Sequence, residues 1–283
     1  MSTKDLSTKA LNTEAWSAKD LPAKDLNTKA PNANPLGAIQ AQVQRYLDFA
    51  YAGGDELPDC FLDDCQMHFS DGSEYLRLPV AILAGSESES PQAKGAARDE
   101  QFVFIDRAAS DLACAKVRYA EAPHYFTDHM TLLYSHNSWR IVSKLWADAS
   151  DYRQSISFDV ADQHTQLRGL QDTIRGFLDG LYTGDVEQCA AAFSTNAEVF
   201  TLTSDGRIYA QPAARFFQEV LNEQKSPKQR GEKRREFIEQ IDMSSLYTAA
   251  VKLNWANPPQ YLCGYLLMIA LGNDWQIVSL TIQ

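Results

Sequence analysis

Two stretches of the sequence match each other and decide the fold. Residues 112–145 read LACAKVRYAEAPHYFTDHMTLLYSHNSWRIVSKL, and residues 248–281 read TAAVKLNWANPPQYLCGYLLMIALGNDWQIVSLT. At a constant offset of 136 residues the same residue types recur in order: Ala113 and Ala249, Lys116 and Lys252, Pro123 and Pro259, Tyr125 and Tyr261, Trp139 and Trp275, and Ile-Val-Ser at 141–143 and 277–279. So many matches at one spacing predict two consecutive copies of a single domain.

Matches upstream of these stretches extend the repeat. Tyr51-Ala-Gly-Gly-Asp55 returns as Tyr182-Thr-Gly-Asp185, and Asp71-Gly72 returns as Asp205-Gly206. The predicted organisation is a tail over residues 1–35, a first domain over 36–149, a linker over 150–163 and a second domain over 164–283. The second copy is the degenerate one, because it lacks charged residues that the first copy has at equivalent positions.

Each copy predicts the same secondary structure. A helical rhythm of apolar residues comes first, with Val43, Tyr46, Leu47 and Ala50 in one copy and Leu170, Ile174, Phe177, Leu178 and Leu181 in the other. Both helices run into Gly-Asp, which suits a left-handed helix end, and Asp55 or Asp185 can cap a short following helix. Three strand-like runs follow in each copy. One long helix with a meandering antiparallel sheet is an α+β fold.

The first 35 residues have a different composition. They repeat Lys-Asp-Leu at 4–6, 19–21 and 24–26, contain few large apolar residues, and are interrupted by Pro22, Pro31 and Pro35. This composition favours a disordered tail over the alternative, a docking arm that folds on a partner.

Composition and charge limit the possible partners. The chain has 283 residues, a formal net charge of −11 and 45% hydrophobic residues, enough for two packed domains. The negative charge argues against nucleic acid and anionic membranes as partners. The five cysteines lack C-x-x-C spacing and fit buried thiols in a reducing compartment, so we expect a cytoplasmic protein.

The helix, the Gly-Asp and the segments FLDDCQMHFSDG, HYFTDHMTLLY and SWRIVSKLW together resemble the NTF2-like superfamily, nearest to its SnoaL-like and lumazine-binding branches. The resemblance implies two tandem cone-shaped domains, each with helices packed on a curved antiparallel sheet around a pocket. It also implies that such domains pair. It implies little about activity, because this fold hosts isomerases and dehydratases as well as proteins without catalytic activity.

Asp128 is the most conspicuous polar residue of the first copy. Strand alternation places it on a largely apolar face, where a carboxylate serves either as an acid–base group or in an ion pair. The hairpin should bring Lys144 close to it. The second copy has Gly264 and Leu280 at these positions, so both charges are absent together. This favours a structural pair over a catalytic base.

Other candidate residues lie in the same copy. His68 could act as a general base in a pocket, or could be an ordinary polar-face histidine. Candidate catalytic residues are therefore His68 and Asp128, and candidate ligand-pocket residues are Tyr51, Tyr125, His129 and Trp139. Alternation turns His129 away from Asp128, so these two should not form a dyad. No metal-ligand spacing and no phosphate-binding loop is present, so we expect neither a metal nor a cofactor.

One basic run contrasts with the acidic background and consists of Lys225, Lys228, Arg230, Lys233, Arg234 and Arg235. We interpret it as a solvated loop, with a local anion or partner patch as the alternative.

Two functional hypotheses follow. The favoured one is a non-catalytic protein for small-molecule binding or assembly, taking a small apolar or aromatic ligand, whose two domains form an intrachain pseudo-dimer. The alternative is a cofactor-independent isomerase or dehydratase that works by acid–base chemistry in a pocket of the first domain.

Overall fold

The computed structural model describes residues 34–85, 90–92, 94–121, 124–148, 160–223, 225–257 and 260–283. The expected tail up to residue 33 and the linker from 150 to 159 lie outside the described residues, so those two expectations stay predictions.

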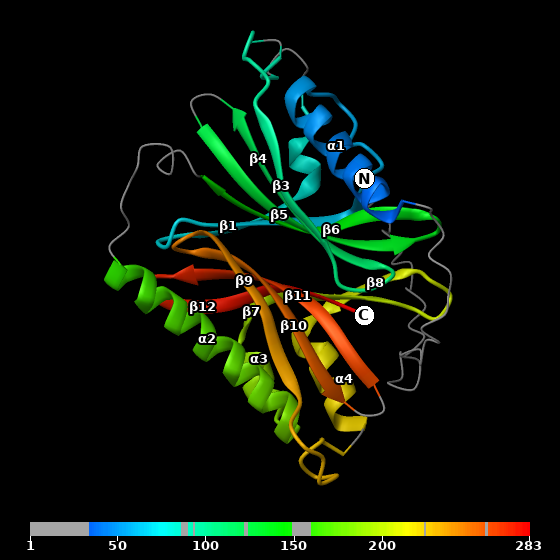
Figure 1. Ribbon diagram of the computed structural model, residues 1–283, viewed down its shortest axis with the longest axis vertical. Helices are drawn as coiled ribbons and strands as arrows, with labels where there is room; N and C mark the ends of the chain where they lie inside the picture. The colour runs from blue at the N-terminus through cyan, green and yellow to red at the C-terminus, as the bar shows by residue number, and fades with distance from the viewer. Residues whose placement is uncertain are drawn as a thin grey trace, which may run out of the picture.

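The first domain contains one long helix, a short 3-10 turn and a six-stranded sheet (Figure 1). Its elements are α1 (Pro35–Ala52), β1 (Phe61–Ser70), β2 (Tyr75–Pro79), η2 (Val80–Leu83), β3 (Glu100–Arg107), β4 (Leu112–Glu121), β5 (His124–Ser135) and β6 (Ser138–Asp148). The strand order is β2-β1-β6-β5-β4-β3.

The second domain repeats this plan and adds two helices. Its elements are α2 (Val160–Thr183), α3 (Val186–Ala191), β7 (Phe193–Leu202), β8 (Ile208–Pro212), α4 (Ala213–Glu223), β9 (Glu236–Ser245), β10 (Thr248–Asn257), β11 (Gln260–Leu271) and β12 (Asp274–Ile282). The strand order β8-β7-β12-β11-β10-β9 is that of the first sheet. The expected α+β fold in two tandem copies is confirmed. Helix α2 begins at Val160, inside the range expected to be linker.

The sheets are mixed rather than wholly antiparallel. The first strand of each sheet runs parallel to the last, β1 beside β6 and β7 beside β12, and every other pair is antiparallel. The parallel pair arises because the chain returns to the first strand only after the whole meander. It places the end of each repeat at the centre of its sheet.

The long helices form where the apolar rhythm predicts them. In α1 the buried residues Ile39, Val43, Tyr46 and Leu47 lie on one face, and the Asn34 side chain caps the first turn by accepting the Gly37 N–H at 2.9 Å. The helix ends at Gly53, whose φ of 74° is a conformation that favours glycine.

Helix α2 ends in the same way, at Gly184 with φ 77°. Asp185 then caps α3 by accepting the Gln188 N–H at 2.9 Å, as expected. The corresponding expectation for Asp55 was wrong, because no helix follows it.

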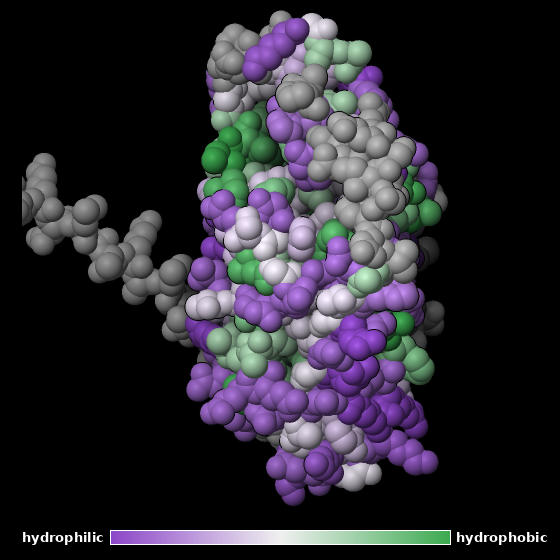
Figure 2. Space-filling view, turned by 90° about the vertical axis from the view of Figure 1, so that its left-hand side faces the viewer, coloured by the Kyte–Doolittle hydropathy of each residue, from purple (hydrophilic) through white to green (hydrophobic). Residues whose placement is uncertain are grey.

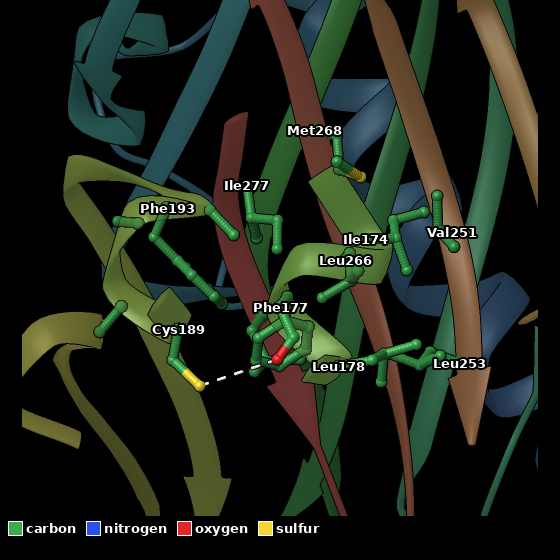
Figure 3. Packing of buried hydrophobic residues seen from close by; sticks show 14 of the residues in the cluster. Ile174, Phe177, Leu178, Cys189, Phe193, Val251, Leu253, Leu266, Met268 and Ile277 are labelled. Atoms are coloured by element: carbon green, nitrogen blue, oxygen red, sulfur yellow. Dashed lines mark hydrogen bonds between the residues drawn. The ribbon is translucent and has the colours of Figure 1, made fainter. Parts of the chain in front are cut away.

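The core of the second domain lies between α2, α3 and the inner face of its sheet. Ile174, Phe177 and Leu178 of α2 meet Val251, Leu253, Leu266, Met268 and Ile277 of the sheet (Figure 3). Cys189 of α3 closes the cluster and directs its thiol at the Phe177 carbonyl, 3.7 Å away. Full burial of each of these leucine, isoleucine, valine, methionine and phenylalanine side chains stabilises the domain by about 1.5–3 kcal/mol.

A bulge in the last strand of each domain reverses the alternation of side chains. It falls at Val142 in β6 and at Val278 in β12, which are equivalent at the 136-residue offset. Strict alternation along β6 and β12 would place Leu145 on the face of Ile141, and Leu280 on the face of Val278. The extra residue instead places Leu145 on the outer face and Leu280 on the inner face.

The outer faces of the two sheets meet at the centre of the molecule, with α1 beyond one sheet and α2, α3 and α4 beyond the other (Figure 1). They share one buried cluster. The first sheet contributes Leu112, Cys114, Leu133, Val142 and Leu145, and the second contributes Phe200, Leu202, Ala250, Tyr265, Leu267, Ile269 and Val278. On the face seen in Figure 2, hydrophilic residues cover most of the lower part, and hydrophobic residues form only small patches there.

Polar contacts between the sheets are reciprocal. Lys116 forms an ion pair with Asp242, and their repeat equivalents Lys252 and Asp106 form the matching pair at 2.9 Å. Equivalent residues thus exchange roles across the contact, which is the pattern of a two-fold interface.

The residues that accompany these pairs are equivalent too. His129 Nε2 lies 3.2 Å from Asp242, and its counterpart Tyr265 donates to Asp106 at 2.5 Å. Although partial burial alone would raise it, the hydrogen bonds from His129 and Lys116 lower the pKa of Asp242 to about 2. Asp242 is therefore charged at neutral pH, as a partner for Lys116 must be.

Candidate functional site

A buried polar cluster occupies the interior of the first domain. It consists of Tyr46 on α1, Tyr119 on β4, Asp128 on β5 and Lys144 on β6, and is called here the polar tetrad. Lys144 Nζ lies 3.0 Å from Asp128 Oδ2, which also accepts a hydrogen bond from the Tyr46 hydroxyl at 2.6 Å. The two tyrosine oxygens are 3.0 Å apart.

The tyrosines of the tetrad are neutral donors. Burial, followed by the nearby charge of Asp128, raises the pKa of Tyr46 well above its usual value, and the same two causes act on the pKa of Tyr119. The Tyr46 hydroxyl donates its one hydrogen to Asp128, so in its contact with Tyr119 it is the acceptor and the Tyr119 hydroxyl is the donor. The ammonium of Lys144 also lies over the rings of Tyr46 and Trp146, at 5.4 and 5.3 Å.

The second domain replaces every member of the tetrad with an apolar residue or glycine. The helix offset of 131 residues gives Phe177 for Tyr46, and the strand offset of 136 gives Trp255 for Tyr119, Gly264 for Asp128 and Leu280 for Lys144. The spacing of the aromatic rings is nevertheless the same in both domains. The ring centroids of Tyr46 and Tyr119 are 6.3 Å apart, and those of Phe177 and Trp255 are 6.4 Å apart. The tetrad is therefore a unit that the first copy has and the second lacks.

His68 does not join the tetrad. Its side chain lies on the outer face of β1, where Nδ1 is 2.9 Å from the Tyr75 hydroxyl and the ring stacks on Tyr75. Burial, followed by repulsion from Arg77, lowers the pKa of His68 to about 3. His68 and Asp128 were the two candidate catalytic residues, and they occupy opposite faces of the sheet, so they cannot act on the same molecule.

The expected pocket residues separate in the same way. His129 is fully buried against Asp242 and Ser244 of the second domain, so it belongs to the contact between the sheets. As expected, it faces away from Asp128. Trp139 is a core residue that packs edge-on against Tyr134. Tyr125 is half-buried in β5 and lines neither of the two hollows described below.

Tyr51 does line a hollow of the first domain, but the hollow is small. Its cavity volume is about 10 Å³, and its walls include Leu47, Tyr119 and Glu121. A water molecule needs roughly 10–15 Å³ of such volume. Neither Asp128 nor Tyr46 belongs to the lining. The polar tetrad therefore meets this hollow only through Tyr119, and the Asp128 carboxylate does not line it.

The larger pocket lies at the equivalent place in the second domain. Its cavity volume is about 50 Å³, within an open hollow of about 800 Å³. The walls are apolar and include Leu181 of α2, Phe216 and Val220 of α4, Trp255 of β10 and Ile282 of β12. None of the candidate pocket residues, which all belong to the first domain, lines this larger pocket, where α4 adds a wall that the short turn η2 does not supply.

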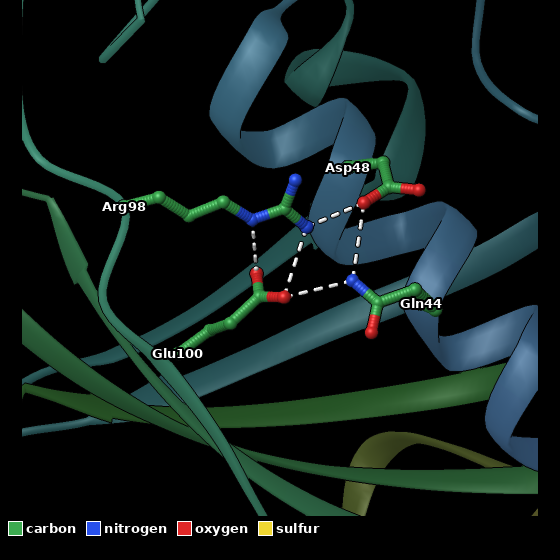
Figure 4. Close-up of polar contacts among 4 residues, drawn as sticks. All are labelled: Gln44, Asp48, Arg98 and Glu100. Atoms are coloured by element: carbon green, nitrogen blue, oxygen red, sulfur yellow. Dashed lines mark hydrogen bonds and ion pairs between the residues drawn. The ribbon is translucent and has the colours of Figure 1, made fainter.

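An arginine network forms one side of each hollow. In the first domain Arg98 donates to both oxygens of Glu100, at 2.9 and 3.0 Å, and pairs with Asp48; Gln44 joins both carboxylates (Figure 4). The guanidinium lies 5.4 Å from the ring centre of Tyr51.

The second domain keeps this network. Arg234 pairs with Asp179 and Glu236 and lies 5.6 Å from the ring centre of Tyr182. All four residues are the repeat equivalents of the first network. Each arginine joins the long helix to the first residue of a strand, so the network fixes the mouth of the cone in both copies.

The basic run surrounds the larger pocket. Five of its residues, Lys225, Arg230, Lys233, Arg234 and Arg235, are part of the lining, and only Lys228 is not. All of the run except Arg230 is exposed, as a solvated loop requires, and the alternative of an anion or partner patch stays a prediction.

Two kinds of site are not found in the part of the chain that the structure describes. No three His, Cys, Asp or Glu side chains gather as metal ligands within the described ranges. No described helix combines the length and apolar character needed to cross a membrane.

Each domain is thus a helix-backed cone on a curved six-stranded sheet, which defines the chain as a tandem NTF2-like protein and confirms the resemblance read from the sequence. The model of the family described as "Putative lumazine-binding" matches residues 34–147 and again residues 165–281, so the chain belongs to that family.

Solved structures are similar to this chain at low identity. An NTF2-like protein of unknown function from Shewanella baltica is 17% identical, with 45% of this chain and 96% of that chain covered and a TM-score of 0.38. One from Methylobacillus flagellatus is 18% identical, with 45% and 95% covered and a TM-score of 0.37. A ketosteroid isomerase-like protein from Erwinia carotovora is 13% identical, with 41% and 97% covered and a TM-score of 0.30. No curated protein matches the chain.

Sequence reasoning missed half of the tetrad and the whole of the larger pocket. The tetrad could have been completed from the repeat, because the changes from Tyr46 to Phe177 and from Tyr119 to Trp255 accompany the two that were noticed. The amphipathic segment at 213–223, which forms α4, was the available signal for the pocket wall.

Proposed function

We propose that the protein binds a small apolar or aromatic molecule in the pocket of its second domain and does not transform it. The observation that carries this proposal is the apolar wall of the pocket. Its interior side chains are leucine, isoleucine, valine, phenylalanine and tryptophan, and the titratable lining groups are arginines, lysines, a tyrosine and Glu236. Acid–base catalysis needs at least two convergent polar groups at the reacting atoms.

The two domains form an intrachain pseudo-dimer in this proposal. Its support is the shared apolar cluster and the reciprocal pairs of Lys116 with Asp242 and Lys252 with Asp106. The first domain then covers the outer face of the second sheet, which would otherwise be a large exposed apolar surface.

The acid–base alternative in the first domain has weaker support. Among the described residues of the first domain, the buried carboxylate with a tyrosine donor is Asp128, and the neighbouring hollow, of about 10 Å³, does not reach it. The family description names lumazine, an aromatic bicyclic compound. The aromatic side chains of Phe216, Phe217 and Trp255 suit a ring of that kind. A cytoplasmic location remains part of the proposal.

Native mass spectrometry of the full chain, followed by extraction of any bound molecule, tests the proposal. The matched variant is Val220→Trp, which fills the pocket from α4 without touching the contact between the sheets. We expect a small molecule to bind or co-purify with the original chain and to be lost from the variant. Equal occupancy in a folded Val220→Trp chain would contradict the proposed position of the site, and chemical conversion of the bound molecule would contradict the absence of catalysis.

A further inference from the structure

We infer that the pocket of the second domain selects an organic anion, with its apolar body against the aromatic wall and its anionic group at the basic mouth. This inference rests on the proposed binding function and adds the chemical class of the ligand. Three observations carry it: the charge at the mouth, the sign of the equivalent surface in the first domain, and the depth of the apolar wall.

The mouth has an excess of positive charge. Five cationic side chains line it, and Glu236 is the only carboxylate among the lining residues. Arg234 is neutralised by Asp179 and Glu236, and Arg230 by Glu232, which it binds through two hydrogen bonds of 2.8 and 3.0 Å. These two arginines hold the loop in place and are not available to a ligand.

Three cations of the mouth remain without an acidic partner among the described residues. Arg235 donates only to the neutral hydroxyl of Tyr261, at 3.0 Å, and Lys225 and Lys233 are exposed without an ion pair. Positive charge beside a hollow with low-dielectric walls attracts anions more strongly than the same charge on a flat surface. It does so here in a chain whose net charge is −11.

The first domain shows that the fold does not require this charge. Its hollow has the equivalent position and the same arginine network, but its charged lining is Arg98 with Asp99, Glu100 and Glu121. Asp99 is the repeat equivalent of Arg235, and Ala97 that of Lys233. Two copies of one fold therefore carry opposite charge at the same place, and the basic copy is the one with the larger cavity.

The wall sets the size and shape of the rest of the ligand. A cavity of about 50 Å³ holds several water molecules by the measure that gives roughly 10–15 Å³ for one. A single aromatic ring fits this depth better than a long alkyl chain. Phe217 and Trp255 provide ring faces and edges for it.

Three probes of matched shape test the inference on the full chain: phenylacetate, 2-phenylethanol and 2-phenylethylamine, titrated by ligand-observed NMR at low ionic strength. We expect phenylacetate to bind most tightly and the amine most weakly. The double variant Lys225→Met and Lys233→Met should weaken phenylacetate binding roughly tenfold, because it removes two charge contacts that are exposed and therefore individually modest. It should leave the alcohol unchanged.

Lys228→Met is the matched control, because it removes the same charge from the same loop outside the pocket lining. Equal affinity for the acid and the alcohol, or equal losses from Lys228→Met and the double variant, would overturn the anion preference while the binding function stands. Failure of all three probes to bind the original chain, or undiminished binding to a folded Val220→Trp chain, would overturn both.

Discussion

Asp128 is fully buried, and only one of its carboxylate oxygens is satisfied. Oδ2 forms the ion pair with Lys144 and accepts the hydrogen bond from Tyr46, whereas Oδ1 has no hydrogen-bond partner among the residues that the structure describes. A buried pair of this kind contributes little net stability compared with apolar residues of similar volume, but losing one member leaves a charge without compensation. The second domain demonstrates the apolar solution at the same positions, with Gly264 and Leu280.

We therefore predict strong coupling between Asp128 and Lys144. Lys144→Leu alone should cost about 3–5 kcal/mol of unfolding free energy, because it strands the carboxylate. Adding Asp128→Ala should recover part of that loss, so the double variant is more stable than the sum of the single losses implies. Urea denaturation of the two single variants and the double variant measures the coupling. Strictly additive losses would show that the two side chains do not act as a pair.

Helices and strands with a regular apolar pattern could be predicted from the sequence, whereas the bulges that interrupt two of the strands could not. The 136-residue repeat and the helical rhythm gave the two copies, both long helices and the three strands that end each copy. The bulges at Val142 and Val278 could not be seen, because a bulge changes the phase of a strand without changing its composition.

The candidate site was predicted less well than the fold. Asp128 and Lys144 were expected to be close because they lie on neighbouring strands, and they are in contact. The pocket depends on how α4 packs against α3, β7 and β8 and on where the basic loop closes, and neither periodicity nor charge pattern encodes these contacts.

Helix α2 offers a prediction with an internal control. A methyl group at Gly180 would lie 2.7 Å from Cys189 Sγ and 2.8 Å from the Cys189 backbone nitrogen, whereas one at Gly176 would meet nothing within 4 Å. Gly176→Ala should stabilise the protein by up to about 1 kcal/mol through helix propensity. Gly180→Ala should destabilise it by about 1–3 kcal/mol, because α3 must move away. Thermal melts compare the two variants, and equal shifts in melting temperature would contradict the close packing of α2 on α3.

For the whole molecule, the two copies divide their properties between them. The first keeps a closed polar interior, and the second keeps an open apolar pocket with a basic mouth. Their outer faces bury a common cluster, and their lysines and aspartates pair reciprocally. Fusion of the copies in one chain keeps them in contact at any protein concentration, so each copy can change without losing its partner.

If the two domains form one assembly through their sheets, they should stay together after the chain between them is cut. A specific protease site inserted between residues 149 and 159 allows the folded chain to be cut into its two domains, which are then passed through a size-exclusion column at micromolar concentration. We expect both fragments to elute together at the size of the uncut chain. Leu267→Glu, which places a charge in the shared cluster, should release them. If the fragments of the original chain separate into two folded monomers, the two domains do not form an assembly through their sheets.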